Sequence, residues 1–252
     1  MTRSIWAVRM VAAALALAWL TLVAPAGAQA DTMASACTKT YAPATLDVTQ
    51  PINLGQLKLQ VYFYACSGAY DSELSAVAAS AQTYLEKRAT EVSRPALVLD
   101  IDETSLSNLP QELASDFGYV PGGDCVHLPD GPCGFSAWVA QAKAKAIDGT
   151  LSLFKAARAR NVAVFFITGR HENEKDATVK NLQAAGYDGY AGLTLRPAND
   201  RRTVIDYKSS ERGKIAEQGY TIIVNMGDQQ SDLAGGYAER AYKLPNPIYF
   251  IP

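Results

Sequence analysis

The stretch ALVLDIDET, residues 96–104, decides the fold class of this chain of 252 residues. Residues 96–101 are apolar apart from Asp100 and follow Pro95, a pattern typical of a strand buried on both faces of a parallel sheet. In open parallel sheets, ligands bind at the carboxyl ends of the strands. A chain that turns out of strand geometry here brings both aspartates to one ligand, so Asp100 and Asp102 are candidate site residues.

Apolar runs and helical patterns alternate through the rest of the chain. Further buried strands are expected over residues 162–167, 193–195 and 220–225. Helices are expected over residues from 148 onward, over 172–185 and over 208–218. Asp148 is the expected N-cap of the first of these helices, and Gly186 and Gly219 are expected to end the other two. This alternation predicts an α/β fold with a parallel sheet.

The chain on either side of the first strand is less regular. Residues 31–52 lack periodicity, and the segment from Asn53 fits both helical and strand spacing. A helix capped by Asp71 is expected next, which makes residues 50–92 a helical lead-in. Residues 107–135 are rich in glycine, proline and cysteine, and they predict a small insertion over the carboxyl end of the sheet.

Other strand ends also carry residues that suit chemistry. Thr168, Gly169 and Arg170 follow the second strong strand and offer a hydroxyl, backbone N–H groups and a flexible turn. Asp228 and Asp232 follow the last strand, and Lys208 lies at the start of a predicted helix. Crowded carboxylates repel one another unless a hard divalent cation takes oxygen ligands from them, and Mg²⁺ fits best. The sequence therefore predicts a magnesium site at the strand ends.

These motifs together resemble the haloacid dehalogenase (HAD) superfamily. DIDET at 100–104, ITGR at 167–170, Lys208 and GDQQSD at 227–232 stand in the order of its four motifs. LVLDIDETSLSN at 97–108, YKSSERGKI at 207–215 and KLPNPIYFIP at 243–252 are similar to its secreted acid phosphatase branch. That branch includes class B and class C acid phosphatases and the plant vegetative storage proteins. The resemblance implies a three-layer α/β/α Rossmann-like parallel sheet with a small cap insertion.

The resemblance also implies a role for each motif residue. Asp100 would attack phosphorus to form an aspartyl phosphate, and Asp102 would act as general acid and then general base. Thr168, Gly169 and Lys208 would bind the phosphoryl oxygens. Mg²⁺ would be held by the Asp100 carboxylate, the Asp102 main-chain carbonyl and Asp228, with Asp232 in support.

Several residues near the motifs allow a plainer interpretation. Lys214 is an alternative to Lys208, and Asp232 could serve only to orient Lys208 or a metal-bound water. Glu103 is interpreted as solvated or capping. Arg170 could bind substrate or be an exposed charge beside a helix start. The remaining expectations are a solvent-facing His171, a His127 that could touch substrate, and a Trp138 packed in the core or cap.

Residues 1–30 are predicted to be a signal peptide rather than part of the fold. An apolar run over residues 10–24 follows two arginines, and Ala28-Gln29-Ala30 resembles a cleavage site, so that Asp31 begins the mature chain. A retained membrane anchor is the alternative, but the run is shorter than the ~20 residues that a spanning helix needs. Residues 31–252 are then expected to form a single domain, exported to the periplasm or the medium.

All four cysteines lie in the exported part of the chain. Export favours disulfides, and Cys125 and Cys133 are the easiest pair to join, which leaves Cys37 and Cys66 as the second pair. A zinc site is the alternative, but the chain contains no C-x-x-C and His127 is the only imidazole nearby.

The predicted function is an exported, Mg²⁺-dependent acid phosphatase that acts on small phosphate monoesters. A formal net charge of −2 gives no electrostatic footprint for a nucleic-acid polymer. After cleavage of the leader no membrane association is expected. Two alternatives remain open, a non-catalytic phosphate-binding or storage protein of the same fold, and a phosphotransferase that uses alcohol acceptors.

Overall fold

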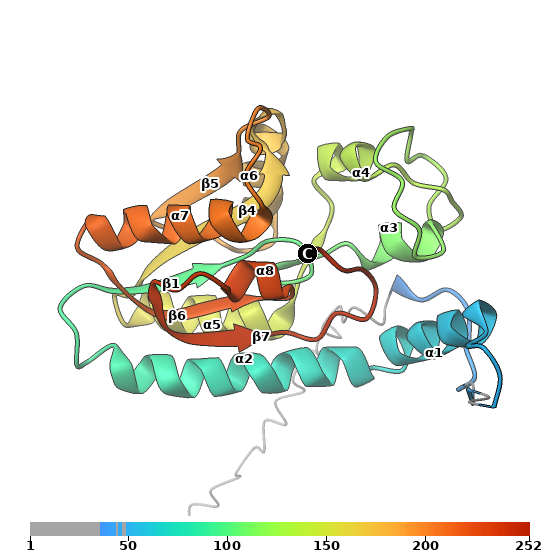
Figure 1. Cartoon of the computed structure of the whole chain (residues 1–252), viewed down its shortest axis with the longest axis horizontal. Helices are drawn as coiled ribbons and strands as arrows, with labels where there is room; N and C mark the ends of the chain where they lie inside the picture. The colour runs from blue at the N-terminus through green and yellow to red at the C-terminus, as the bar shows by residue number, and fades with distance from the viewer. Residues whose placement is uncertain (1–35, 44, 47–48) are drawn as a thin grey trace, which may run out of the picture. The chain divides into compact units, whose positions relative to one another are not determined.

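Five parallel strands form the sheet of the computed structural model, which describes residues 36–43, 45, 46 and 49–252 (Figure 1). From edge to edge the order is β5 (Gly192–Arg196), β4 (Ala163–His171), β1 (Pro95–Leu99), β6 (Thr221–Gly227) and β7 (Ala238–Lys243). The chain adds β4 and β5 on one side of β1 and then crosses to add β6 and β7 on the other. The strand order therefore reverses beside β1, where open α/β sheets bind their ligands.

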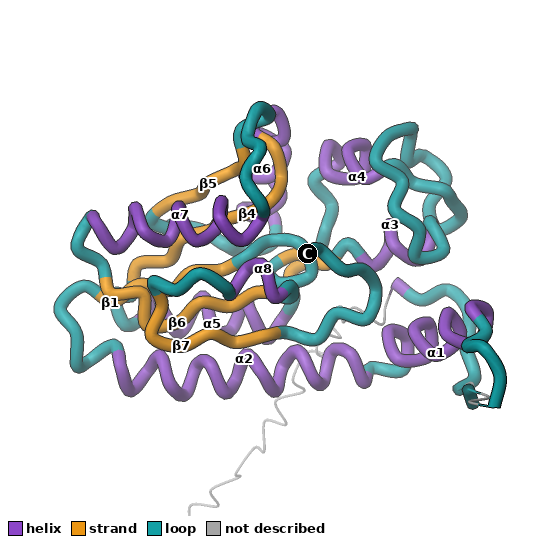
Figure 2. The backbone as a smooth tube through the Cα atoms, viewed as in Figure 1, coloured by secondary structure: helices purple, strands orange, loops and turns teal. Residues whose placement is uncertain are grey.

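Helices cover both faces of the sheet and complete the three predicted layers (Figures 1 and 2). Leu97 and Leu99 of β1 face a core shared with α2 (Ala69–Arg88), α5 (Asp148–Ala159) and α6 (Lys175–Ala184). Ala96 and Val98 point to the other face, where Tyr207 and Ile215 of α7 (Val204–Glu217) cover them. Because successive strand side chains alternate between faces, a strand buried on both sides must be apolar throughout, as residues 95–99 are.

The structure corrects the expected helix starts. The segment from Asn53 forms helix α1 (Leu54–Cys66), whose N-cap Asn53 accepts a hydrogen bond from the Gln56 backbone N–H at 3.2 Å. Asp71 and Asp148 are not N-caps, because the N-cap residue of α2 is Gly68 and that of α5 is Ile147. Both aspartates lie in the first helical turn instead, where they still face the positive end of the helix dipole.

Two strand and helix boundaries also differ from expectation, and both concern the site. Helix α7 begins at Val204 because the Thr203 side chain accepts from the Asp206 backbone N–H, so Lys208 lies inside the helix rather than at its start. The expected turn at residues 168–170 is instead part of β4, which continues to His171 beside β5. Strand β7, with the sequence AERAYK, lies at the edge of the sheet and was not predicted.

A segment of residues 108–144, called the cap here, leaves the sheet just after β1. Two short strands, β2 (Leu106–Ser107) and β3 (Lys145–Ala146), pair antiparallel at its base. The cap carries α3 (Leu109–Ala114), a loop and α4 (Phe135–Gln141), and Figure 1 shows it standing beyond the sheet on the side of the C-terminus. It contains most of the predicted insertion at 107–135, together with α4.

Both predicted disulfides are present, Cys37–Cys66 and Cys125–Cys133, with Cα–Cα distances of 5.6 and 4.2 Å. The zinc alternative is therefore wrong for these four cysteines. The predicted signal peptide at residues 1–30 lies outside the described residues. Among the helices that are described, none has the length and apolar character that crossing a bilayer requires.

Candidate active site

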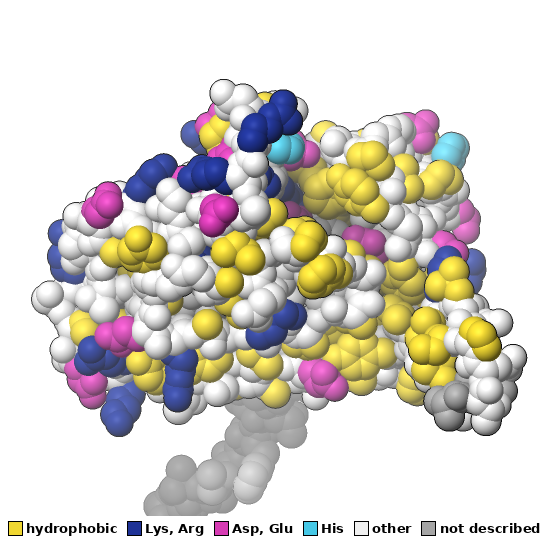
Figure 3. Space-filling model, viewed as in Figure 1, with side chains coloured by type: hydrophobic (Ala, Val, Ile, Leu, Met, Phe, Trp, Pro, Cys, Tyr) yellow, Lys and Arg dark blue, Asp and Glu magenta, His cyan; other side chains and the backbone are white. Residues whose placement is uncertain are grey.

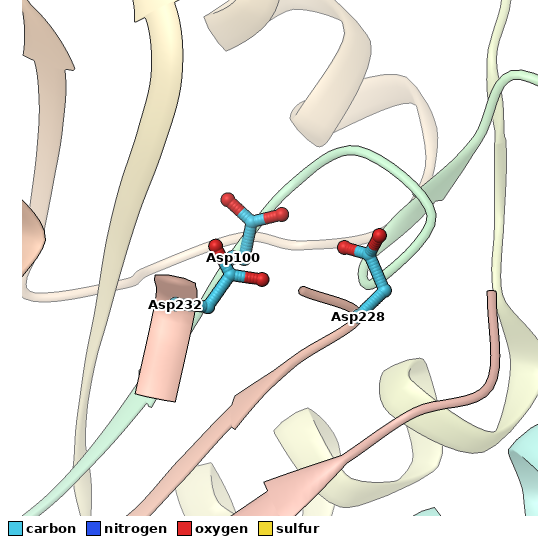
Figure 4. Close-up of side chains that lie close together, drawn as sticks. All are labelled: Asp100, Asp228 and Asp232. Carbon is cyan, nitrogen blue, oxygen red and sulfur yellow. The ribbon is translucent and has the colours of Figure 1, made fainter. Parts of the chain in front are cut away.

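Three aspartates converge at the carboxyl end of the sheet, as Figure 4 shows. Asp100 follows β1, Asp228 follows β6, and Asp232 lies on the short helix α8 (Gln230–Leu233). One carboxylate oxygen of each lies within 4.8 Å of the other two, and all three residues are buried. The cluster forms because β1 and β6 are neighbours in the sheet, so that their ends meet at one edge.

A single lysine crosses to this cluster from α7. Lys208 Nζ lies 2.5 Å from Asp100 Oδ1 and 2.5 Å from Asp232 Oδ1, and its side chain is buried. Lys214, the alternative from the sequence, is exposed and pairs with Glu211 instead. Lys208 is therefore the lysine of the cluster, and Asp232 orients it directly.

Asp102 is paired with a buried arginine from the neighbouring strand. Arg170 Nη2 donates to Asp102 Oδ1 at 2.6 Å, and Arg170 Nε lies 3.1 Å from both carboxylate oxygens. The Arg170 side chain is only 1% exposed, so the interpretation as an exposed charge is wrong. Thr168 and Arg170 both lie within β4, and both are buried.

Thr168 and Gly169 stand beside this pair on β4. Thr168 is fully buried, and its Oγ1 accepts a hydrogen bond from the Arg170 backbone N–H at 3.1 Å. A Cβ placed on Gly169 would meet no atom within 4 Å, so the backbone there borders open space. The structure thus leaves room for a ligand next to the Gly169 main chain.

A tight turn after β1 takes Asp102 out of strand geometry, which is the condition under which Asp100 and Asp102 can serve one ligand. The Ile101 carbonyl accepts hydrogen bonds from the backbone N–H groups of Ser105 and Leu106, both at 2.8 Å. Thr104 Oγ1 donates to Asp228 Oδ1 at 3.0 Å, which joins the turn to the end of β6. The turn therefore positions Asp102 and steadies Asp228 at the same time.

Asn246 and Asn108 are two residues of the site that lie outside the four motifs. Asn246, from the C-terminal segment, donates to Asp228 Oδ2 at 2.8 Å, and Gln229 Nε2 donates to the same oxygen at 2.7 Å. Asn108 Nδ2 donates to Asp102 Oδ1 at 2.8 Å. The only sequence signal was their place inside the longer stretches 97–108 and 243–252 that resemble the acid phosphatase branch.

Glu103 is buried rather than solvated. It is 1% exposed, and its Oε1 accepts the backbone N–H of Asn108, the N-cap residue of α3, at 2.5 Å. The capping interpretation of Glu103 is the one that the contacts favour. Trp138 is buried in the cap as expected, His171 is exposed as expected, and His127 is exposed in the loop of the Cys125–Cys133 disulfide.

The buried charges shift the acidities of the site. Burial raises the pKa of Asp100 well above its usual value in spite of the opposing charge of Lys208. Burial and the nearby charge of Asp232 raise the pKa of Asp228 to about 6. Burial also acts to raise the pKa of Asp102, but the Arg170 guanidinium outweighs it, so that the net pKa is lowered. Four aspartates, Asp100, Asp102, Asp228 and Asp232, thus share this site with only two cations, Lys208 and Arg170.

Glu112 of α3 gives the stability of the protein a pH dependence that can be measured. Burial, and then the charge of Asp102, raise its pKa from 4.5 to about 7. A raised carboxyl pKa means that the folded state binds the proton more tightly, so the stability that this group contributes is present at acidic pH and is lost as the pH rises through 4.5 to 7. Glu112→Gln should match the wild type at pH 4 and exceed it by up to about 3 kcal/mol at pH 8. Thermal unfolding at the two pH values checks this, and a difference that does not change with pH would contradict it.

The fold and the cluster define a class of protein, an α/β protein with a carboxylate-rich site at the strand ends and a small cap. A family model described as HAD superfamily, subfamily IIIB (acid phosphatase), matches residues 25–252. The chain is 34% identical over 191 residues to acid phosphatase 1 of Solanum lycopersicum, an alignment that covers 75% of this chain and 72% of that protein. It is 30% identical over 156 residues to vegetative storage protein 1 of Arabidopsis thaliana, covering 62% of this chain and 55% of the relative.

The chain therefore belongs to subfamily IIIB of the HAD superfamily, the acid phosphatases. The resemblance seen in the motifs is confirmed, and so is the enzyme class, a phosphoric monoester hydrolase. The class C acid phosphatase from Bacillus anthracis has the same fold, with a TM-score of 0.60 at 23% identity over 77% of this chain and 84% of that one. That likeness confirms the HAD-like α/β architecture.

Proposed function

We propose that this protein is an exported, Mg²⁺-dependent acid phosphatase that hydrolyses phosphate monoesters through an aspartyl phosphate on Asp100. The observation that carries the proposal is the set of contacts around one buried carboxylate. Asp100 accepts a hydrogen bond from Lys208, lies within reach of Asp228, and precedes by two residues Asp102, which pairs with Arg170 of β4. A nucleophile, a cationic anchor and an acid–base group thus meet at one strand end.

The proposed first step transfers the phosphoryl group to the protein. An Asp100 carboxylate oxygen attacks phosphorus, the ester P–O bond breaks, and protonated Asp102 gives its proton to the departing alcohol oxygen. The Thr168 hydroxyl, the Gly169 backbone N–H and Lys208 bind the phosphoryl oxygens. Lys208 also favours the ionised form of Asp100, which is the form that can attack.

The proposed second step releases phosphate and restores the protein. Asp102 takes a proton from water, the water oxygen attacks phosphorus, and the bond from phosphorus to Asp100 breaks. Arg170 favours the ionised form of Asp102, which is the form that accepts the proton in this step and not the form that donates it in the first step. The same carboxyl thus loses a proton in the first step and regains it in the second.

The residues present fit a bound Mg²⁺ ion. The donors are all oxygens, which a hard cation prefers, and the excess negative charge at Asp100 and Asp228 favours a cation between them. Asp100, the Asp102 main-chain carbonyl and Asp228 would hold the ion. Asp232 accepts hydrogen bonds from Lys208 and from the Gln229 backbone N–H, and we assign it the supporting role of positioning Lys208. Bound Mg²⁺ would supply positive charge that stabilises the phosphoryl oxygens.

Asn246→Ala should weaken Mg²⁺ binding. The Asn246 amide fixes the orientation of Asp228, and the loss of such outer partners typically costs about 10- to 100-fold in metal affinity. Titration calorimetry with Mg²⁺ alone measures the change. Gln230→Ala, which truncates an exposed amide two residues after Asp228, is the matched control. Equal Mg²⁺ affinity in Asn246→Ala and the wild type would contradict the assignment of Asp228 as a ligand.

Export is proposed from the leader and the cysteines together. Both disulfides lie in the chain after residue 30, and disulfides persist in oxidising compartments such as the periplasm or the medium. The predicted signal peptide at 1–30 gives the route. Mass measurement of the protein from culture fluid or periplasm should find a chain that begins at Asp31.

Turnover of a chromogenic aryl phosphate tests the proposed activity. Purified protein should release phosphate with Mg²⁺ and lose that activity with a chelator, with the higher rates at acidic pH. Absence of turnover with every phosphate monoester tried would favour the storage alternative, since two of the similar proteins are named vegetative storage proteins. Transfer of the phosphoryl group to an added alcohol at the expense of free phosphate would favour the phosphotransferase.

A further inference from the structure

A chain of buried hydrogen bonds connects the cap with the turn that carries Asp102. The Trp138 indole Nε1, on α4 of the cap, donates to Asn108 Oδ1 at 2.8 Å. Asn108 Nδ2 in turn donates to Asp102 Oδ1 at 2.8 Å and to Glu103 Oε2 at 2.9 Å. Asn108 is 1% exposed and Trp138 is 4% exposed, so the bond between them is shielded from water.

The Trp138 bond determines which way the Asn108 amide faces. An indole N–H can only donate, so the amide oxygen must turn toward Trp138 and the amide nitrogen toward the two carboxylates. The nitrogen has two hydrogens, and Asp102 and Glu103 are the two acceptors that take them. A flipped amide would place its oxygen against two carboxylates and its nitrogen against a donor, which a buried site disfavours strongly.

The Asn108 bond falls on one particular oxygen of Asp102. Oδ1 accepts from Asn108 Nδ2, from Arg170 Nη2 and from Arg170 Nε. Of the described residues, only Arg170 Nε donates to Oδ2, at 3.1 Å. Oδ1 is therefore the anchored oxygen, and Oδ2 is the oxygen left for exchange of a proton.

We propose that Asn108 is a positioning residue that holds the Asp102 carboxylate with Oδ2 toward the reacting group, and that Trp138 makes this arrangement depend on the seating of the cap. The proposal rests on the proposed role of Asp102 as general acid and base. Asn108 and Trp138 do not themselves react. They affect the reaction only through the orientation of the Asp102 carboxyl group. Helix α4 is thereby coupled to the turn that carries Asp102.

Dependence on the leaving group separates this role from a merely structural one. An alkoxide is a strong base and needs a proton as it departs, whereas nitrophenolate leaves without one. Asn108→Ala should therefore lower kcat/KM for an alkyl phosphate about 10-fold more than for p-nitrophenyl phosphate. A loss of fold or of metal would lower both rates by the same factor.

Trp138→Phe tests the same chain with less disturbance of packing. Phenylalanine keeps an aromatic ring in the cap but lacks the N–H, so the alkyl-to-aryl ratio of kcat/KM should fall about three- to fivefold, the size expected for one buried hydrogen bond. Val139→Ala, a truncation of the next buried residue of α4, is the control and should leave the ratio unchanged.

Each result decides the matter. A selective loss with alkyl phosphate in Asn108→Ala and Trp138→Phe supports the proposal. An unchanged alkyl-to-aryl ratio of kcat/KM in both variants, whether or not the rates themselves fall, would overturn it. If Asn108→Ala does not fold, the ratio in Trp138→Phe alone decides. Asp102→Asn measured alongside shows whether the acid itself acts: a wild type without turnover, or an Asp102→Asn variant without selective loss, would sink the proposed function instead.

Discussion

Asp100→Asn should abolish turnover of every phosphate monoester and leave the fold intact. An amide cannot attack phosphorus, and removal of a covalent nucleophile typically lowers the rate by about 10⁴-fold or more. Asparagine has the shape of aspartate, and burial already disfavours the charge that it removes. The variant should therefore unfold at the same temperature as the wild type or at a higher one.

Rates with p-nitrophenyl phosphate and thermal unfolding on the same preparations check both halves of this expectation. Asp130→Asn, which removes a carboxylate from the loop of the cap disulfide, is a control that should keep full activity. If Asp100→Asn kept a tenth of the wild-type rate, Asp100 could not be the nucleophile. If it failed to fold, the buried carboxylate would be a structural requirement rather than a catalytic one.

Lys208→Met should destabilise the protein as well as inactivate it. Lys208 is the cation between Asp100 and Asp232, and its removal leaves two buried carboxylates facing each other. Removing one partner of a buried ionic group typically costs about 3–5 kcal/mol. The loss should shrink at acidic pH, because burial raises the pKa of Asp100 and a protonated Asp100 needs no cation.

Urea unfolding at pH 7 and at pH 4.5 measures this loss. The double variant Asp100→Asn with Lys208→Met should regain part of the stability, since one of the two repelling charges is gone. Lys214→Met is the matched control, because Lys214 makes only an exposed pair with Glu211 and such pairs contribute about 1 kcal/mol or less. A Lys208→Met variant as stable as the Lys214→Met control would show that the lysine does not balance the cluster.

The sheet and the cluster at its edge could be predicted because short continuous segments of the sequence indicate both. An apolar run that ends in acids predicts a buried strand with a polar carboxyl end, and residues 96–104 and 220–232 both do so. Once these strands are neighbours, geometry brings Asp100 and Asp228 together. The four cysteines allow few pairings. The close spacing of Cys125 and Cys133 predicted the first disulfide and left Cys37 and Cys66 as the second.

What could not be predicted depends on contacts between distant segments. Arg170 was undecided because its partner Asp102 lies 68 residues earlier and is reached only when β4 continues past Thr168. Asn108 and Asn246 carry no charge and no periodicity, so only their place inside the stretches 97–108 and 243–252 marked them. Asp71 was mistaken for a cap because aspartate suits both the N-cap and the first turn, and only the position of Gly68 separates the two.

Direct detection of a phosphoryl group on Asp100 tests the proposed chemistry most sharply. Asp102→Asn should lack the base for the second step, so enzyme mixed with Mg²⁺ and p-nitrophenyl phosphate and then quenched in acid should retain the intermediate. Peptide mapping by mass spectrometry should find the phosphoryl group on Asp100, in an amount that approaches one per chain. A wild type that turns over while the quenched variant carries the group on another residue, or on none, would contradict the assignment of Asp100.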